Sequence, residues 1–167
     1  SSALTVTATS FSQAAGTINA GGLAIINVSG ASSQASGAVV AGSGGITKSG
    51  AGTLTLSGTN TYTGVTTISA GTLSVSALAA GGANSNIGAS SNAAANLVLD
   101  GGTLQYTGAA QSTDRLFTLT NNGGTLDASG SGALNFSNTG SVAFSGTSAR
   151  TLTLTGTNTG SNTLAAV

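Results

Sequence analysis

The chain lacks several types of side chain, and each absence excludes a kind of chemistry. Its 167 residues include no cysteine, histidine, proline, methionine or tryptophan. Without cysteine there is no disulfide and no thiolate metal site, and without histidine there is no Ser-His-Asp triad. Three acidic and three basic residues balance to zero net charge, so no long-range field attracts nucleic acid or an anionic membrane. No apolar run approaches the roughly 20 residues of a membrane helix. We therefore expect no nucleic-acid partner and no membrane insertion.

Glycine, small hydroxyl residues and aliphatic residues make up most of what is present. The chain has 27 glycines and a mean hydropathy of +0.31. Disordered chains are usually rich in charge and proline and poor in β-branched residues, which this chain is not. Frequent Val, Ile and Thr favour strands, whereas recurrent glycine and the scarcity of Glu, Lys and Arg disfavour helices. The composition therefore predicts an all-β fold.

Apolar residues recur two positions apart, which places both on one face of a strand. Leu54 and Leu56 flank Thr55, for example, and further pairs are Leu4 and Val6, Leu73 and Val75, Leu97 and Leu99, Leu104 and Tyr106, Phe117 and Leu119, Leu134 and Phe136, Val142 and Phe144, and Leu152 and Leu154. The aromatic residues are predicted to fill or cap the core, namely Phe11, Tyr62, Tyr106, Phe117, Phe136 and Phe144. Stacking of the tyrosines on sugars is the alternative.

Glycine-containing corners repeat with a short and nearly constant period. The apolar residues that follow Gly-Gly, Gly-Gly-Thr or Ala-Gly-Thr form pairs separated by this period, namely Leu23 and Ile46, Leu54 and Leu73, and Leu104 and Leu126. Periods of about 20–50 residues are typical of solenoids and propellers, and a propeller blade takes about 40–45 residues. Coils of about 20 residues with tight glycine corners therefore predict a parallel β-helix, or β-solenoid.

One segment resembles a known family. Residues 44–64, GGITKSGAGTLTLSGTNTYTG, and their continuation SAGTL at 69–73 resemble the autotransporter-associated β-strand repeat of bacterial type V secreted and surface proteins. The resemblance implies a right-handed parallel β-helix, export across the cell envelope and an extracellular or cell-surface location. We expect a single domain over 1–167, in which 44–160 is the repeat-like part and 1–43 is a diverged N-terminal coil region.

A short sequence segment that occurs twice agrees with a repeat organisation. TLTLSGTN at 53–60 returns as TLTLTGTN at 151–158. We interpret the second copy as the start of a further set of coils.

The few polar residues that stand out are predicted to be structural. Asn60 and Asn158 follow turn-like stretches and suit corners that need a left-handed conformation. Asp100 and Asp127 lie beside glycines and are expected to cap turns by bonding local backbone.

The remaining charged residues give little indication of catalysis. Lys48 is predicted to be solvated or to bind a turn, and Asp114 with Arg115 to lie in a surface loop or an interfacial ion pair. A polysaccharide-cleaving β-helix needs carboxylates clustered in one groove, which three aspartates do not readily supply. We expect a protein that is not an enzyme and that holds no metal or cofactor.

The predicted function is structural: a surface stalk or a self-assembling filament subunit that serves adhesion or a matrix. A β-helix has strand edges at both ends, so copies of the chain are the expected partners. The candidate self-association residues are Ser1, Leu4, Val6, Leu164 and Val167. The edges are covered either by such copies or by neighbouring coils of a longer chain.

A threonine face that binds ice or carbohydrate, such as surface glycans, is the alternative. It rests on the triplets TVT at 5–7, TLT at 53–55, TLT at 118–120 and TLT at 151–153, whose spacing is irregular.

Overall fold

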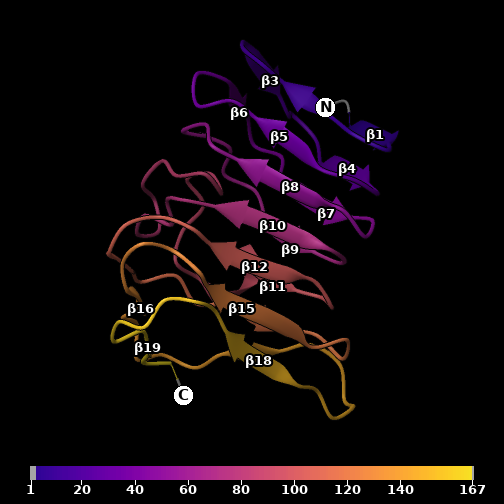
Figure 1. Ribbon diagram of the computed structural model, residues 1–167. Coiled ribbons are helices and arrows are strands. Elements are labelled where there is room, and N and C mark those ends of the chain that lie inside the picture. The colour runs from indigo at the N-terminus through magenta and orange to yellow at the C-terminus, as the bar shows by residue number, and fades with distance from the viewer. Residues whose placement is uncertain (1–2, 167) are drawn as a thin grey trace.

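Short parallel strands stack from one end of the molecule to the other (Figure 1). The computed structural model describes residues 3–166. Seven strands form sheet 1, in the order β1 (Leu4–Ala8), β4 (Ala24–Val28), β7 (Ile46–Ser49), β9 (Thr66–Ile68), β11 (Leu97–Leu99), β14 (Thr118–Leu119) and β17 (Ala143–Phe144).

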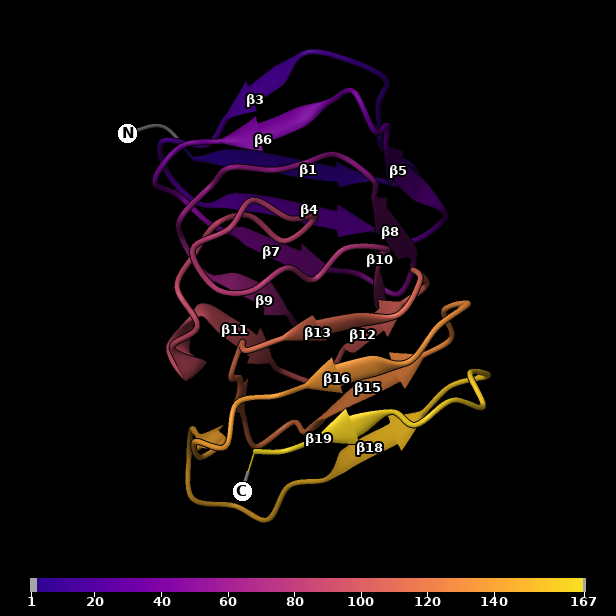
Figure 2. The same ribbon diagram turned by 90° about the vertical axis from the view of Figure 1, so that its left-hand side faces the viewer.

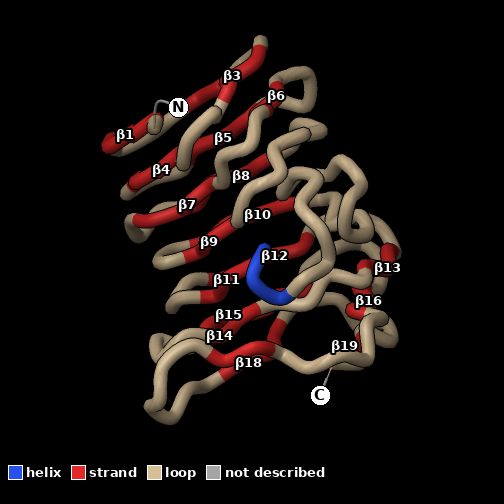
Figure 3. Tube along the Cα trace, turned by 180° about the vertical axis from the view of Figure 1, so that it is seen from behind, coloured by secondary structure: helices blue, strands red, loops and turns tan. Residues whose placement is uncertain are grey.

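Sheet 2 runs beside sheet 1 and also has seven strands. Its order is β2 (Ser12–Gln13), β5 (Ser32–Gln34), β8 (Thr53–Leu56), β10 (Thr72–Val75), β12 (Thr103–Tyr106), β15 (Gly124–Ala128) and β18 (Leu152–Thr155). Figure 3, seen from behind, shows the sheet 1 strands along one side of the stack.

The third side of the coils is less regular. Near the first coils it holds the pair β3 (Thr17–Asn19) and β6 (Val39–Ala41), and near the last coils sheet 3, made of β13 (Gln111–Thr113), β16 (Leu134–Phe136) and β19 (Thr163–Leu164) (Figure 2). One 3-10 turn, η1, covers Ala94–Asn96. No helix within residues 3–166 is long and apolar enough to cross a membrane. The predicted all-β parallel β-helix is confirmed.

The strand register shows the length of each coil. Leu4 pairs with Ala24, Ala24 with Ile46 and Ile46 with Thr66, so the first three steps along the chain are nearly equal. The next step, from Thr66 to Leu97, is about half as long again. The predicted coil length therefore holds for the regular coils. The longer coil carries extra residues between β10 and β11, and we call residues 76–96 the insertion.

Inward side chains form columns because the strands pair in register. Leu54, Leu73, Leu104 and Leu126 occupy one position of four successive sheet 2 strands, and each is at most 7% exposed. Burying a leucine side chain contributes roughly 1.5–3 kcal/mol. The apolar half of the alternating pattern therefore forms a narrow core along the whole stack.

Glycine is required where coils approach closely. Gly71 has a φ of 63°, and a Cβ there would overlap the carbonyl oxygen of Gly52 on the coil before. Left-handed conformations are confined to glycines within the described residues. The left-handed conformation expected at Asn60 and Asn158 is therefore wrong, because glycine takes these corners without the steric cost of a Cβ.

Core placement of the phenylalanines is confirmed for three of the four. Phe117 and Phe136 are buried, with ring centroids 6.1 Å apart in an edge-on arrangement, and Phe11 packs against the core while half-buried. Phe144 is 66% exposed, so its predicted burial is wrong. It is paired in register with the buried Leu119, but β17 is the end strand of sheet 1 within residues 3–166, so the ring has a described strand on one side only.

Replacing Leu73 by alanine tests the column. Leu73 is fully buried between Leu54 and Leu104, so we expect Leu73→Ala to lower the free energy of unfolding by about 2–5 kcal/mol. The matched control is Thr72→Ala on the half-buried outer face of the same strand, which should cost less than about 1 kcal/mol. Urea unfolding followed by circular dichroism measures both, and equal losses would contradict the column.

Candidate interaction surfaces

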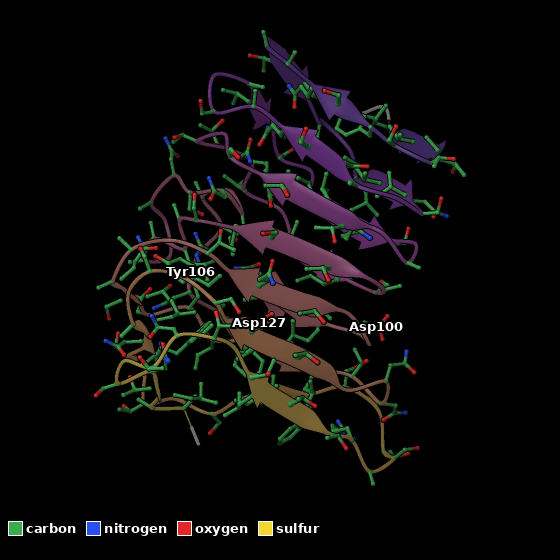
Figure 4. All side chains as sticks on the ribbon, in the orientation of Figure 1. Asp100, Tyr106 and Asp127 are labelled. Atoms are coloured by element: carbon green, nitrogen blue, oxygen red, sulfur yellow. The ribbon has the colours of Figure 1, made fainter. Side chains whose placement is uncertain are left out.

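The three aspartates do not form a catalytic group. Within residues 3–166, no three acidic, cysteine or histidine residues lie close enough together to hold a metal ion. The Asp100 carboxylate accepts hydrogen bonds from the Thr120 hydroxyl at 2.5 Å and from the Asn122 amide at 2.8 Å. Asp127 accepts from the Gln105 amide at 3.0 Å. Both carboxylates therefore join side chains of adjacent coils rather than the turn backbone that was expected. Figure 4 shows Asp100 at a corner of the stack, well apart from Asp127 on sheet 2.

Asp114 fastens the insertion to the coil that follows it. Its carboxylate accepts hydrogen bonds from the backbone N–H of Gly81 at 2.7 Å and from the side-chain amide of Asn92 at 2.9 Å. The Gly81 bond is the main reason that the pKa of Asp114 lies below its ordinary value. Asp114 thus stabilises the insertion in its charged form.

Arg115 lies inside the molecule, under the insertion, and not in a surface loop. It is 2% exposed. Its guanidinium donates five hydrogen bonds, to the carbonyls of Ala79 (2.9 Å), Ser90 (2.9 Å), Gly88 (3.0 Å) and Ala83 (3.4 Å) and to the Ser90 hydroxyl (3.1 Å). Burial lowers the pKa of this guanidinium, while Tyr62 and Asp114 act in the opposite direction. The expected ion pair with Asp114 is wrong, because Asp114 binds Gly81 and Asn92 whereas Arg115 binds carbonyls of the insertion.

The position of Arg115 could have been found from the sequence. Thr113, Arg115 and Phe117 alternate with partly exposed residues, and all three are buried. The same alternation that placed Phe117 in the core applies to Arg115. The preference of charged residues for the surface concealed this signal.

Lys48 is a turn-binding residue and is not solvated. Its side chain is fully buried in an inward column of sheet 1, between Ile26 and Ile68. The ammonium donates to the carbonyl oxygens of Ser49 (2.9 Å), Gly50 (2.8 Å) and Ala70 (3.2 Å). Burial lowers the pKa of the amine. Lys48 therefore links the corners of two adjacent coils from inside.

Asn60 belongs to a row of buried amides. Its Oδ1 accepts from the Gln34 amide at 2.7 Å and from the backbone N–H of Val40 at 2.7 Å, while its Nδ2 donates to the Asn86 carbonyl at 2.7 Å. Gln34 in turn donates to Gln13 at 3.2 Å. Three coils and the insertion are joined through these side chains.

Asn158 is the counterpart of Asn60 in the second copy of the repeated segment, at 151–158. The two copies begin at β8 and β18, which lie on the same sheet with three strands between them. The Asn158 amide donates to the Gly130 carbonyl at 2.9 Å, and its Oδ1 accepts from the backbone of Gly160 at 2.9 Å. Unlike Asn60 it is half-buried, because it lies on the last coil.

Both tyrosines fill the interior. Tyr62 is fully buried and its hydroxyl pairs with the Thr66 hydroxyl at 2.7 Å. Tyr106 is 1% exposed and donates to the Ala109 carbonyl at 2.5 Å. Burial raises the pKa of both phenols. The rings are inaccessible to sugars, so the sugar-stacking alternative is wrong.

The outer face of sheet 2 carries a row of hydroxyls, which we call the threonine ladder. Five successive strands place threonine at the same register position: Thr53, Thr72, Thr103, Thr125 and Thr153. This ladder differs from the predicted one, because the triplets at 5–7 and 118–120 lie on sheet 1 whereas those at 53–55 and 151–153 lie on sheet 2. The irregular spacing counted along the sequence thus conceals an ordered row on one face.

The last coil leaves part of the core open. A depression there is lined mainly by Leu126, Leu134, Phe136, Leu154 and Leu164, and a second one beside it includes Phe144 and Leu152. Leu154 and Phe144 are 61% and 66% exposed. We call this surface the C-terminal end of the stack.

The predicted self-association residues lie at the two ends. Leu164 is half-buried at the C-terminal end, and Leu4 and Val6 are half-buried on the first strand of sheet 1, at the opposite end. Ser1 and Val167 lie outside the described residues.

Residues 46–75, from β7 to β10, match the family named passenger-associated transport repeat. This confirms the resemblance of the segment to autotransporter repeats. The chain is also similar to the adhesin BmaC autotransporter of Brucella suis biovar 1 (strain 1330), with 49% identity over 109 residues. These residues are 64% of this chain but 3% of that protein. No solved structure matches the chain significantly.

Loss of Arg115 should loosen the insertion. Arg115→Met removes the donors to several buried carbonyls, and each unsatisfied group costs about 1–3 kcal/mol, so we expect a loss of at least about 3 kcal/mol in the free energy of unfolding. The control Arg150→Met removes an arginine whose carbonyl bonds are solvent-exposed or only partly buried and should cost less than about 1 kcal/mol. Hydrogen exchange of residues 76–96 should also rise in the first variant alone. Unchanged exchange there would contradict the role of Arg115.

The charge of Asp114 should make stability depend on pH. Its folded pKa lies below the unfolded value of about 3.9, so its contribution is fully present above that value and is lost as the pH falls through the folded pKa. The stability advantage of the native chain over Asp114→Asn should therefore be constant near pH 6 and shrink below about pH 4. Urea unfolding of both proteins across this range measures the difference, and an advantage independent of pH would contradict the assignment.

Proposed function

We propose that the chain is a non-enzymatic, rigid β-solenoid segment of an extracellular, bacterial adhesin-type passenger, in which it serves as a stalk or as a filament subunit. The observation that carries the proposal is the passenger repeat, which is built into two continuous seven-strand ladders. The similarity to a bacterial adhesin autotransporter supports a surface location and a role in adhesion.

Rigidity follows from how the coils are joined. Each strand of sheets 1 and 2, apart from the end strands, bonds to one strand on either side, so bending requires rupture of main-chain hydrogen bonds along both sheets. Lys48 joins adjacent corners, and Gln34 and Asn60 join three coils through buried amides. Such a stack holds its two ends in a fixed position relative to each other, as a stalk must.

The distribution of polar groups supports a non-enzymatic role. Asp100 and Asp127 bond neighbouring side chains at separate sites, and Asp114 holds the insertion. The buried cations Lys48 and Arg115 are occupied by main-chain carbonyls. None of these groups shares a groove in which a proton donor and acceptor could act on one bond.

A surface-display experiment tests the stalk. The chain is inserted into a displayed β-helical passenger that carries a known adhesive tip. We expect export, cleavage by added protease outside the cell, and full adhesion, because the insert continues the solenoid. The matched control Leu73→Asp places a charge in the core column and should abolish export or adhesion. Equal behaviour of the two inserts, or failure of the native insert, would contradict the proposal.

The threonine ladder favours a second candidate, binding of glycan or ice by the outer face of sheet 2. Its members repeat at the spacing between strands, about 4.8 Å. In the same display system without a tip, adhesion to glycan-coated surfaces that is lost in Thr103→Glu and kept in Thr47→Glu on sheet 1 would favour this candidate over a pure stalk.

A further inference from the structure

The chain contains one Asn-Gly dipeptide, Asn122-Gly123, and one Asp-Gly dipeptide, Asp100-Gly101. Each lies between a strand of sheet 1 and the next strand of sheet 2, on consecutive coils. The two dipeptides therefore share one corner of the stack, where Figure 4 labels Asp100. The flanking strands β11, β12, β14 and β15 are each paired on both sides, so this corner lies within the stack and away from both ends.

Asn122 combines the features that favour attack on its own side chain. The backbone nitrogen that follows an asparagine can bond to the side-chain carbonyl carbon, because a five-membered ring results. A side chain on the following residue hinders this attack, and glycine has none. Every asparagine other than Asn122 precedes a residue with a side chain. Asn122 is also exposed, so water reaches it.

Hydrogen bonds hold both reacting groups in the folded chain. Nδ2 of Asn122 donates to the Asp100 carboxylate at 2.8 Å, and the Thr120 hydroxyl donates to the same oxygen at 2.5 Å. The Gly123 N–H donates to the Thr120 carbonyl at 3.0 Å. Ring closure removes the proton of Gly123 and the Nδ2 group of Asn122, so the reaction breaks both of their bonds. The corner therefore stabilises the unreacted form.

We propose that Asn122 is a site of spontaneous deamidation and that the Asp100 carboxylate slows the reaction by holding the side-chain amide. In the first step the Gly123 nitrogen bonds to Cγ of Asn122, and the Nδ2 group leaves with the nitrogen's proton as ammonia. Water then opens the resulting succinimide at either carbonyl and leaves an aspartate or an isoaspartate at position 122. The reaction takes no other reactant, and it does not depend on the proposed function.

The product changes the corner because a charge replaces a hydrogen-bond donor. An aspartate at position 122 places its carboxylate against that of Asp100, which had accepted a hydrogen bond from the amide. Like charges on neighbouring strands repel. An isoaspartate adds one carbon to the main chain next to Gly123, whose carbonyl accepts from the Gly101 N–H at 2.8 Å. Deamidation therefore loosens the joint between two coils and gives a chain of zero net charge a negative charge.

Ageing of the folded native chain tests the site. After incubation at neutral pH, peptide mapping by mass spectrometry measures the conversion of each asparagine, and isoaspartate-specific methylation detects the second product. We expect conversion at Asn122 to exceed that at every other asparagine and to be faster in urea. Asn121 is the internal control, because it is exposed in the same turn but precedes a residue with a side chain. Conversion at Asn122 no greater than at Asn121 would overturn the site.

The role of Asp100 is tested by removing its carboxylate. Asp100→Ala takes away the acceptor of the Asn122 amide, and loss of one hydrogen bond corresponds to a rate about two- to tenfold higher in the folded chain. The matched control is Asp127→Ala, which removes a carboxylate that bonds Gln105 elsewhere on the stack and should react like the native chain. In urea all three chains should react equally. Equal rates for native and Asp100→Ala in the folded state would overturn the role of Asp100.

A second variant reaches the same bond without altering Asp100 or Asn122. Thr120→Val keeps a branched side chain and removes the hydroxyl that donates to the carboxylate, so it should also accelerate conversion at Asn122. Circular dichroism and hydrogen exchange of both sheets show whether each variant is folded. An unchanged rate in folded Thr120→Val, with Asp100→Ala unfolded, would count against the role of Asp100.

The effect of the added charge is measured separately. Asn122→Asp and Asn122→Ser both remove the amide, but only the first adds a carboxylate beside Asp100. We expect Asn122→Asp to unfold at a lower urea concentration than Asn122→Ser at neutral pH. Equal midpoints would contradict the loosening of the corner by charge.

Discussion

The parallel main-chain hydrogen bonding between successive coils is the interaction on which the rest of the structure depends. It holds each residue over the residue at the same register position one coil earlier, so a single leucine becomes a column and a single threonine becomes a ladder. Close approach of the coils requires glycine at corners such as Gly71. Within sheets 1 and 2, every strand between the two end strands is paired on both sides.

A core this narrow places polar groups inside, and the chain satisfies them with main-chain partners. Lys48 and Arg115 donate to carbonyl oxygens at corners and in the insertion, and Asn60 accepts and donates within the row of amides. No buried side-chain nitrogen or oxygen within residues 3–166 lacks a hydrogen bond. An unpaired buried polar group costs about 1–3 kcal/mol, so these few residues decide whether the irregular coil is stable. In a chain with so few charged side chains, the buried cations act as links between segments and not as a source of electrostatic attraction.

The regular coils were predictable because their information is local. The alternation at Leu54 and Leu56 indicates a strand and its inward face. The glycine corner before Leu73 indicates the coil period. Phe144 alternates like a core residue and is nevertheless exposed. Its burial would depend on a further coil, which the local pattern does not specify. Arg115 shows the opposite case, since its alternation correctly indicated an inward position while its charge indicated the surface. The row of buried amides joins residues a whole coil apart along the chain, which local patterns do not connect.

The sequence by itself determined the fold class, the coil period and the match of residues 46–75 to a passenger repeat, because each depends on short local patterns. The tertiary structure alone decided which threonines share a face, since the longer coils shift the spacing along the chain without disturbing the register in space. It also decided that the insertion is built round Arg115 and that Leu154 and Phe144 are left uncovered. These features depend on which coils become neighbours, and hydrogen bonding between strands sets that relation only once the chain has folded.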